Sequence, residues 1–424
     1  MRRTGSPRIE GYAIVAAASL VGALAFRRPE LAILAAPFAL LLVIGAGTAR
    51  DPKVEVDLSL PSDRALEGEE LAATLTARAE APVDRLEIGL GLPRSVHLVD
   101  GGRSLVVRLR AGEEREVPLR LRCDRWGVWD VGRIELRARD ALRLVVWEGR
   151  VRDARPIEAY PRLETVSRLV PAVETQAFTG SEVARVKGDG IEYADIRDYR
   201  PGDRVRSINW RASARRAGLV VNERHPERNT DVVLLVDSFA DVRDGSRSTL
   251  DDAVRACATL ATRYLERRDR VGLVTFGGIL RWLQPGMGSG QRYRLIATLL
   301  ETGVEPTYAW RDINLLPSRI LPPKALVVAV SPLVDPRFEV ALEDLRARGF
   351  DVFVLEVDPL PLVQPGRDEV EQLAYRLWVL ERQVRRSRLE SIGIAVARWS
   401  ETSSLEAALG EVRTYRRYAR LARV

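Results

Sequence analysis

Residues 188–216 read GDGIEYADIRDYRPGDRVRSINWRASARR, and residues 217–230 lead from there into the most hydrophobic strand pattern of the chain, DVVLLVDS at 231–238. Within 188–216, charged residues alternate with aliphatic residues and with three aromatic ones, Tyr193, Tyr199 and Trp210. A solvated run of charges would not contain so many apolar side chains. The pattern predicts a half-buried platform, residues 188–216, in which guanidinium groups meet carboxylates through paired hydrogen bonds.

Downstream of this platform, strand and helix patterns alternate. Near-continuous apolar runs occur at 231–238, 270–278, 325–333, 351–360 and 394–401, and helical patterns occur at 249–268, 291–302, 337–348, 369–391 and 405–423. Apolar runs of this kind are typical of parallel strands that are buried on both faces. Residues 231–424 are therefore predicted to form a doubly wound, Rossmann-like α/β domain, with a short hairpin after its second strand.

Upstream of the platform, the hydrophobic period changes to two. Between residues 54 and 161, short runs such as VEVDLSL and LAATLTARAE alternate apolar with polar residues, and turn residues separate them. This spacing predicts an immunoglobulin-like β-sandwich. Residues 162–187 show little periodicity and are interpreted as a connector, and residues 188–230 form a separate segment between connector and α/β domain.

Residues 1–53 are predicted to form a membrane hairpin. Two uncharged stretches, 11–26 and 31–49, are separated by four residues only. The second approaches the ~20 residues that span a bilayer, and the first can extend through its flanking arginines. A signal peptide is the alternative for the first stretch. Positive charges are more numerous at the outer ends than in the connecting loop, which favours an inner-membrane protein with a cytoplasmic soluble part.

The composition restricts the chemistry. The chain has 424 residues, a net charge of +7, two cysteines and two histidines. Two distant cysteines cannot build a disulfide framework or a CxxC metal knuckle, and two histidines leave little room for histidine-based catalysis. The basic balance is carried by arginines that mostly neighbour acidic residues, so we do not expect nucleic-acid binding, although Arg204–Arg216 would be its site.

The platform closely resembles the signature of a bacterial family called domain of unknown function 58. The matching positions are Gly190, Glu192, Tyr193, Arg197, Tyr199, Pro201, Gly202, Asp203, Arg206, Ile208, Trp210, Ala212, Ser213, Ala214 and Arg215. The resemblance implies a membrane hairpin, a β-rich segment and a von Willebrand factor type A-like domain.

A magnesium site is a further implication of the type A resemblance. Such domains bind the ion with a D-x-S-x-S loop, a threonine and a later aspartate, because hydroxyl and carboxylate oxygens suit a hard cation. Here Asp237 is kept, but Phe239 and Asp241 stand at the serine positions and Pro332 at that of the later aspartate. We predict at most a degenerate site of Asp237, Asp241 and Thr307, with Asp335 as a further candidate, and no other cofactor.

The resemblance also implies a function, since members of the family commonly accompany MoxR-type AAA+ ATPases. We expect a membrane-anchored, non-enzymatic adaptor that binds such an ATPase and other membrane proteins in the assembly or maturation of other proteins. The predicted interaction residues are Glu192, Tyr193, Arg197, Tyr199, Asp203, Arg206, Trp210, Arg211 and Ser213. Alternatively, these residues only brace the α/β domain. Two other functions remain open, a magnesium-dependent ligand-binding domain and a hydrolase that uses Ser213 or Ser238.

Overall fold

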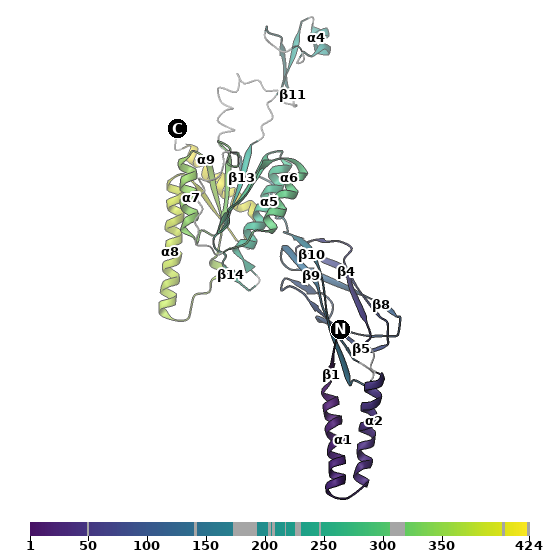
Figure 1. Ribbon diagram of the computed structural model, residues 1–424. Helices are drawn as coiled ribbons and strands as arrows, with labels where there is room; N and C mark the ends of the chain where they lie inside the picture. Colours follow the sequence, from purple (N-terminus) through teal and green to yellow (C-terminus); the bar gives the residue numbers. More distant parts are fainter. Residues whose placement is uncertain are drawn as a thin grey trace. The chain divides into compact units, whose positions relative to one another are not determined.

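The structure is a computed structural model, and it describes residues 1–48, 51–139, 142–172, 193–201, 205, 208–216, 218–224, 230–245, 247–305, 319–400 and 403–421. The chain divides into two compact units, Met1–Arg162 and Leu163–Val424. The first unit contains an apolar N-terminal helix and a β-rich region, and the second has α/β content (Figure 1). The coarse prediction of an apolar helix, a β-rich part and an α/β part is therefore confirmed.

Two sheets form the β-rich part of the first unit. One has the order β1-β10-β9-β5-β7, with β3 beside β10, and the other has the order β2-β4-β8-β6. Buried residues alternate along the strands, and both sheets contribute them to one hydrophobic cluster. The strands are β1 Arg2–Gly5, β2 Val54–Ser59, β3 Arg64–Leu66, β4 Glu70–Ala79, β5 Val83–Gly91, β6 Val96–Leu98, β7 Ser104–Leu109, β8 Glu114–Cys123, β9 Gly127–Arg139 and β10 Val145–Tyr160.

Strand β1 ties the N-terminus to this unit. It pairs antiparallel with β10, and Ser6, which follows it, donates a backbone hydrogen bond to Leu144 O at 2.8 Å. The Ser6 hydroxyl also caps helix α1 (Pro7–Ala25) by accepting from Arg8 N. Near the end of α2 (Glu30–Thr48), Gly45 packs so closely on Leu144 that a Cβ there would lie 2.3 Å from Leu144 Cδ1. Both helices therefore meet the β-rich part near Leu144.

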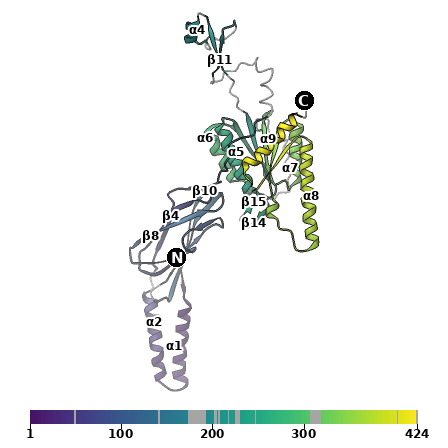
Figure 2. The same ribbon diagram turned by 180° about the vertical axis from the view of Figure 1, so that it is seen from behind.

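Helices α1 and α2 lie side by side in both views (Figures 1 and 2). The Tyr12 and Phe38 rings connect them at 5.5 Å between centroids, while many of their apolar side chains point outward and are exposed. Helix α1 is long and apolar enough to cross a membrane. The apolar part of α2 within the described residues, Glu30–Gly45, is shorter.

The second unit contains a six-stranded sheet in the order β17-β16-β13-β18-β19-β20, parallel except for the edge strand β17. Its strands are β13 Asp231–Ser238, β16 Arg270–Gly277, β17 Arg281–Gly286, β18 Leu326–Ser331, β19 Asp351–Val357 and β20 Ala395–Trp399, and a short hairpin of β14 Arg243–Asp244 and β15 Arg247–Ser248 follows β13. The helices are α5 Thr249–Glu266, α6 Gly288–Leu300, α7 Pro336–Ala347, α8 Glu369–Ser391 and α9 Leu405–Leu421, and η3 is a 3₁₀ turn at Leu360–Leu362.

Helices cover both faces of this sheet. Phe338 and Leu342 of α7 and Leu389 of α8 share a buried cluster with Val352 and Val354 of β19. Phe353 of β19 points to the opposite face, where Arg416 of α9 lies over its ring. The chain leaves β13 in one direction towards β16 and later returns to β18 on the other side of β13. The carboxyl ends of β13 and β18 therefore form the topological switch point, the edge at which such sheets bind ligands.

Candidate functional site

Asp237 and Ser331 meet at the switch point. Asp237 lies near the end of β13 and is 1% exposed, and the Ser331 hydroxyl, at the end of β18, donates to its Oδ2 at 2.5 Å. The backbone N–H of Phe239 donates to the other oxygen, Oδ1, at 3.0 Å. Burial raises the pKa of Asp237 from 3.8 to about 7, although these two hydrogen bonds oppose the shift. Both carboxyl oxygens thus have protein partners.

Phe239, in the loop after β13, packs against Phe276 and Arg337 at the carboxyl edge of the sheet. Its ring packs edge-on against Phe276 at 5.0 Å, and the Arg337 guanidinium lies 4.3 Å from the ring centroid. Arg337 in turn donates from Nη2 to Asp335 Oδ2 at 2.6 Å and from Nε to Asp335 Oδ1. Burial acts to raise the pKa of Asp335, but the hydrogen bonds from Arg337 outweigh it and hold that pKa below its usual value. The oxygens of Asp335 are therefore committed to the start of α7.

Asp241, a predicted metal ligand, accepts hydrogen bonds at the start of helix α5. Its Oδ1 accepts hydrogen bonds from the Ser248 hydroxyl at 2.7 Å and from Leu250 N at 3.0 Å, and Oδ2 accepts from Arg243. A carboxylate at a helix N-terminus is stabilised by the N–H groups there. The described residues contain no group of three His, Cys, Asp or Glu side chains placed to hold a metal ion. Thr307 lies outside the described residues.

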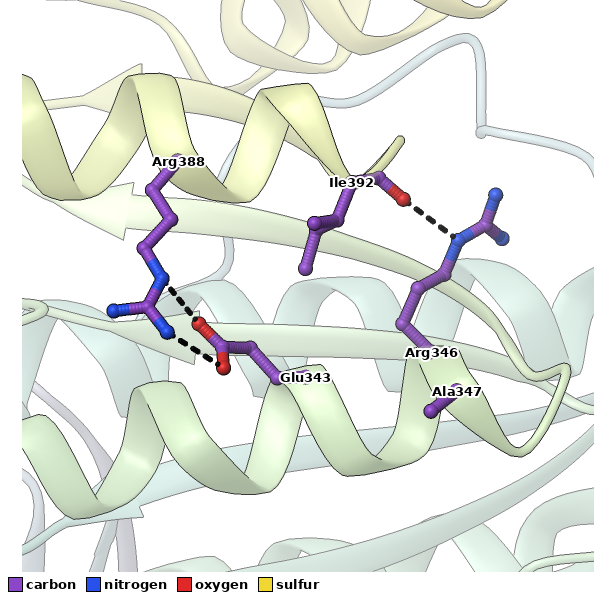
Figure 3. A pocket seen from close by; sticks show the side chains of 5 residues that line it. All are labelled: Glu343, Arg346, Ala347, Arg388 and Ile392. Carbon is purple, nitrogen blue, oxygen red and sulfur yellow. Dashed lines mark hydrogen bonds and ion pairs between the residues drawn. The ribbon is translucent and has the colours of Figure 1, made fainter.

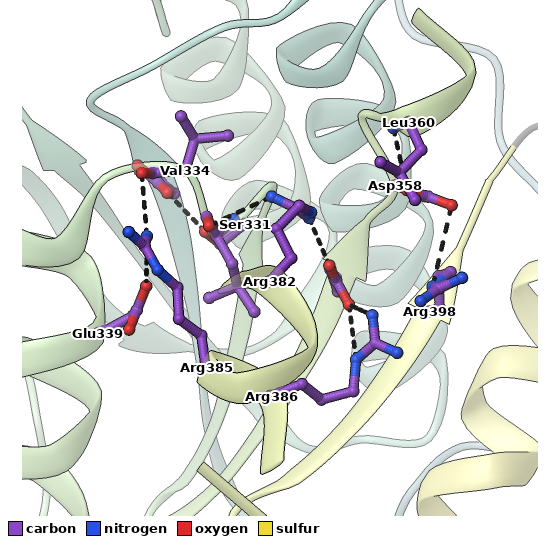
Figure 4. A network of polar contacts seen from close by, with 12 residues as sticks. Ser331, Val334, Glu339, Asp358, Leu360, Arg382, Arg385, Arg386 and Arg398 are labelled. Carbon is purple, nitrogen blue, oxygen red and sulfur yellow. Dashed lines mark hydrogen bonds and ion pairs between the residues drawn. The ribbon is translucent and has the colours of Figure 1, made fainter. Parts of the chain in front are cut away.

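A buried charge network lies beside the switch point, at the carboxyl end of β19. The Glu356 carboxylate is 1% exposed and accepts from two arginines of α8, Arg382 and Arg386. Arg382 also donates to Leu333 O at 3.3 Å, and Arg385 donates to Val334 O at 3.2 Å. Figure 4 shows these three arginines reaching from α8 towards the sheet. The network fixes the loop after β18, in which Leu333 has a positive φ of 50°.

The described part of the platform, β11 (Tyr193–Asp198) and α4 (Trp210–Arg216), forms a small unit with β12 (Val220–Arg224), which follows it and pairs antiparallel with β11. Of the predicted interaction residues, Glu192, Asp203 and Arg206 lie outside the described residues, and so do the side chains of Tyr193 and Arg197. Tyr199 is partly exposed, and its backbone N–H donates to Leu219 O at 2.8 Å.

Asn209 and Ser213 hold α4 against β12. Asn209 Oδ1 accepts from Ala212 N at 3.0 Å at the start of the helix, and its amide donates to Asn222 at 2.8 Å. Ser213 is buried, and its hydroxyl donates to Asn209 O at 2.8 Å and accepts from Val220 N at 2.9 Å. Trp210, by contrast, is 63% exposed, and Arg211 is exposed beside it. Ser213 is thus structural, while Trp210 and Arg211 point to solvent.

Replacing Ser213 with alanine is expected to loosen this small unit. The Val220 N–H, which belongs to a buried residue, would lose its partner, at a cost of about 1–3 kcal/mol. Amide hydrogen exchange of Val220 should become faster, whereas Ser213→Thr, which keeps the hydroxyl, should retain most of the protection. Unchanged exchange in Ser213→Ala would contradict the structural role.

Neither described pocket coincides with these clusters. One, of about 410 Å³, lies between α7 and α8 and is lined by Glu343, Arg346, Ala347, Arg388 and Ile392 (Figure 3). Arg388 and Glu343 pair at 2.9 Å, and Arg346 donates to Ile392 O at 3.3 Å. The Arg388 charge is therefore paired with Glu343, whereas Arg346 is held by a backbone carbonyl. The other pocket, of about 370 Å³, lies in the β-rich part beside Gly89 and Gly91.

Residues 195–368 match the family described as "Protein of unknown function DUF58". Over these residues the chain is similar to that family. The DUF58 region contains α4, β12, Asp237, Ser331 and Glu356, and it ends directly before α8. A curated relative, "Uncharacterized protein YeaD" of Bacillus subtilis (strain 168), is 32% identical over 84 residues, which cover 20% of this chain and 20% of that protein.

Solved structures resemble this chain only weakly. The PilB minor pilin of Streptococcus sanguinis is 11% identical with a TM-score of 0.28, over 80% of this chain and 87% of the pilin. A fragment of native alpha-2-macroglobulin from Escherichia coli is 16% identical with a TM-score of 0.22, over 28% of this chain and 20% of the other.

The polar contacts around Glu356 and Ser331 are structural features that sequence reasoning missed. Glu356 interrupts the apolar run DVFVLEV, and such a charge inside a strand buried on both faces is a signal that a buried partner exists. Arg382 and Arg386 are four residues apart and so lie on one face of α8, which is the matching signal.

Proposed function

We propose that this chain is a membrane-anchored, non-enzymatic adaptor that binds other proteins through the platform and works with a MoxR-type AAA+ ATPase in the assembly or maturation of other proteins. One observation carries the proposal: within α4, Ser213 is buried and bonded, while Trp210, three residues before it, is exposed. A residue that only braced the fold would be expected to have its large apolar side chain buried.

An exposed tryptophan beside an exposed arginine is the composition of a protein-binding surface. Tryptophan and arginine dominate the binding energy of measured interfaces, since they combine large contact areas with directional contacts. The rigid attachment of α4 through Asn209 and Ser213 reduces the entropy lost when a partner binds.

The finer fold assignments belong to this proposal. The switch point between β13 and β18, with Asp237 at the end of β13, supports a von Willebrand factor type A-like α/β domain. The two sheets around one core in the first unit support an immunoglobulin-like β-sandwich.

For the anchor, we propose that α2 is a second span and that the soluble part is cytoplasmic. Strand β1 ties the start of α1 to the same unit that the chain enters after α2, so both ends of a hairpin would lie on one side of the membrane. The positive residues at these ends, among them Arg2, Arg3 and Lys53, favour the cytoplasmic side over the loop with Arg27 and Arg28.

A magnesium-dependent ligand-binding domain is the second candidate, and the buried carboxyl of Asp237 at the switch point favours it. A metal ion there would have to replace the hydrogen bond from Ser331. It would also need ligands other than Asp241 and Asp335, whose oxygens bind α5 and α7.

Replacing Trp210 with alanine tests the adaptor directly. The tagged full chain is purified in detergent from membranes of its native host, and the co-purified AAA+ ATPase is quantified. We expect Trp210→Ala to reduce it by roughly ten-fold or more, as for a hot-spot residue. Trp282→Ala is the matched control, because Trp282 is also an exposed tryptophan, at 43%, but lies on β17, outside the platform. Equal recovery with both variants would contradict the proposal.

A further inference from the structure

Helix α8 has an inner face that packs on the sheet domain and an exposed outer face that is apolar. Its inner face contacts the sheet domain through Leu389 and Arg382, both buried, and through the partly buried Trp378 and Val379. Nearly opposite, on the outer face, lie five large apolar side chains that are each between 55% and 71% exposed: Val370, Leu373, Leu377, Leu380 and Val384. In both views α8 lies at the outside of its helical layer, and its N-terminal end extends past the sheet (Figures 1 and 2).

The outer face has the spacing of a coiled coil. The five residues are separated by three, four, three and four positions, which assigns Val370, Leu377 and Val384 to position a of a heptad and Leu373 and Leu380 to position d. Beta-branched residues at a with leucine at d favour parallel two-stranded coiled coils. Here valine occupies two of the three a positions, and leucine occupies both d positions.

The charges that flank this stripe fit a second copy of the chain. Arg376 is exposed at position g, and Glu381 is exposed at position e of the next heptad. In a parallel pair, each g residue faces the e residue of the next heptad in the other helix, so Arg376 of one copy meets Glu381 of the other, twice per dimer. In an antiparallel pair, position a of one helix faces position d of the other, and g faces g. Arg376 of one copy would then meet Arg376 or Gln383 of the other, and neither offers an opposite charge.

We propose that α8 is a self-association surface, on which two copies of this chain form a short parallel coiled coil. A membrane surface is the competing occupant, but a helix that lies on anionic lipid carries mainly Lys and Arg along the edges of its apolar face. Here Glu369, Glu381 and the two arginines Arg376 and Arg388 alternate along those edges. Mixed charge favours the protein partner.

The association is expected to be weak in dilute solution and stronger where copies are concentrated. The apolar outer face of α8 covers about two heptads, so the area that two copies would bury between them lies at the low end for specific protein interfaces. Since α8 is already held in helical form by Arg382, Arg385 and Arg386, the cost of forming the helix is not part of the binding free energy. The proposal does not depend on the adaptor function, and α8 lies outside the DUF58 match.

Disulfide cross-linking of single-cysteine substitutions in the full chain, in native membranes, tests the proposal. Both native cysteines, Cys123 and Cys257, are buried, so the background is low. In a parallel coiled coil, equivalent a positions face each other, and Leu377→Cys should give a strong band at twice the mass of the chain. Gln372→Cys is the matched control, because it is an exposed residue of the same helix at position c. An antiparallel pair would give no such band with Leu377→Cys alone.

Charge reversal supplies a second readout in the Leu377→Cys background. Arg376→Glu or Glu381→Arg alone places like charges opposite each other and should lower the cross-linked fraction roughly two- to five-fold. The double reversal should restore it. A Leu377→Cys band no stronger than that of Gln372→Cys would overturn the proposal. A second pair of results would also overturn it: no cross-link at any a position, together with loss of vesicle binding in Leu377→Glu. That outcome would assign α8 to the membrane surface.

Discussion

Replacing Glu356 with alanine is expected to lower the free energy of unfolding of the α/β domain by about 3–5 kcal/mol. The Glu356 carboxylate balances Arg382, whose side chain is 5% exposed, and Arg386, which is 22% exposed. Without it, Arg382 would keep a buried positive charge with weaker partners, the hydrogen bond to Leu333 O and the Trp378 ring. Burial already lowers the pKa of Arg382 against the opposing effect of Glu356, so the loss of that carboxylate removes its main stabilising partner.

Chemical denaturation of the purified full chain, followed through the α/β domain, measures this effect. Glu343→Ala is the matched control. Glu343 also pairs with an arginine of α8, Arg388, but the Arg388 side chain is 65% exposed. Surface ion pairs of that kind contribute about 1 kcal/mol or less. If Glu356→Ala cost no more than Glu343→Ala, the buried network would not stabilise the loop after β18.

The second large effect concerns pH. Burial raises the pKa of Asp237 to about 7, while in the unfolded chain it has its ordinary value of 3.8. Between these values the folded carboxyl binds a proton that the unfolded one has lost, so the stability contributed by this group falls as the pH rises from 3.8 to about 7. The difference corresponds to on the order of 4 kcal/mol. Asp237→Asn should remove that fall and be the more stable protein at pH 8.

The measurement compares unfolding free energies of the native chain and Asp237→Asn across this pH range. An asparagine amide can accept from Phe239 N and donate to Ser331 Oγ, so the local contacts are retained. Asp335→Asn is the control that should not change the fall between pH 3.8 and about 7, because the lowered pKa of Asp335 places the loss of its own contribution below pH 3.8. Equal pH dependence of Asp237→Asn and the native chain would contradict the buried, raised carboxyl.

The local sequence pattern was sufficient to predict many of the helices and strands of the α/β domain. The predicted helix 369–391 has the same bounds as α8, because charges and apolar residues follow the helical period through its whole length. The position of Asp237 was also predictable, since carboxyl ends of parallel strands gather at one edge of the sheet.

Contacts between distant segments were not predictable. RRTG has no strand pattern, and it forms β1 only because β10 offers an open edge. Asp241 was predicted as a ligand from its place in the loop, but its oxygens bind Ser248 and Leu250, which the loop pattern does not specify. Likewise, the signature gave Ser213 and Trp210 equal weight, and only the fold separates the bonded hydroxyl from the exposed indole.

The most direct test of the account compares two variants in one co-purification experiment with the MoxR-type ATPase. Trp210→Ala alters the exposed platform, whereas Asp237→Asn removes the carboxylate that a metal-dependent site would need. An adaptor that binds through the platform predicts loss of the ATPase with Trp210→Ala and full recovery with Asp237→Asn. Loss with Asp237→Asn and full recovery with Trp210→Ala would contradict it.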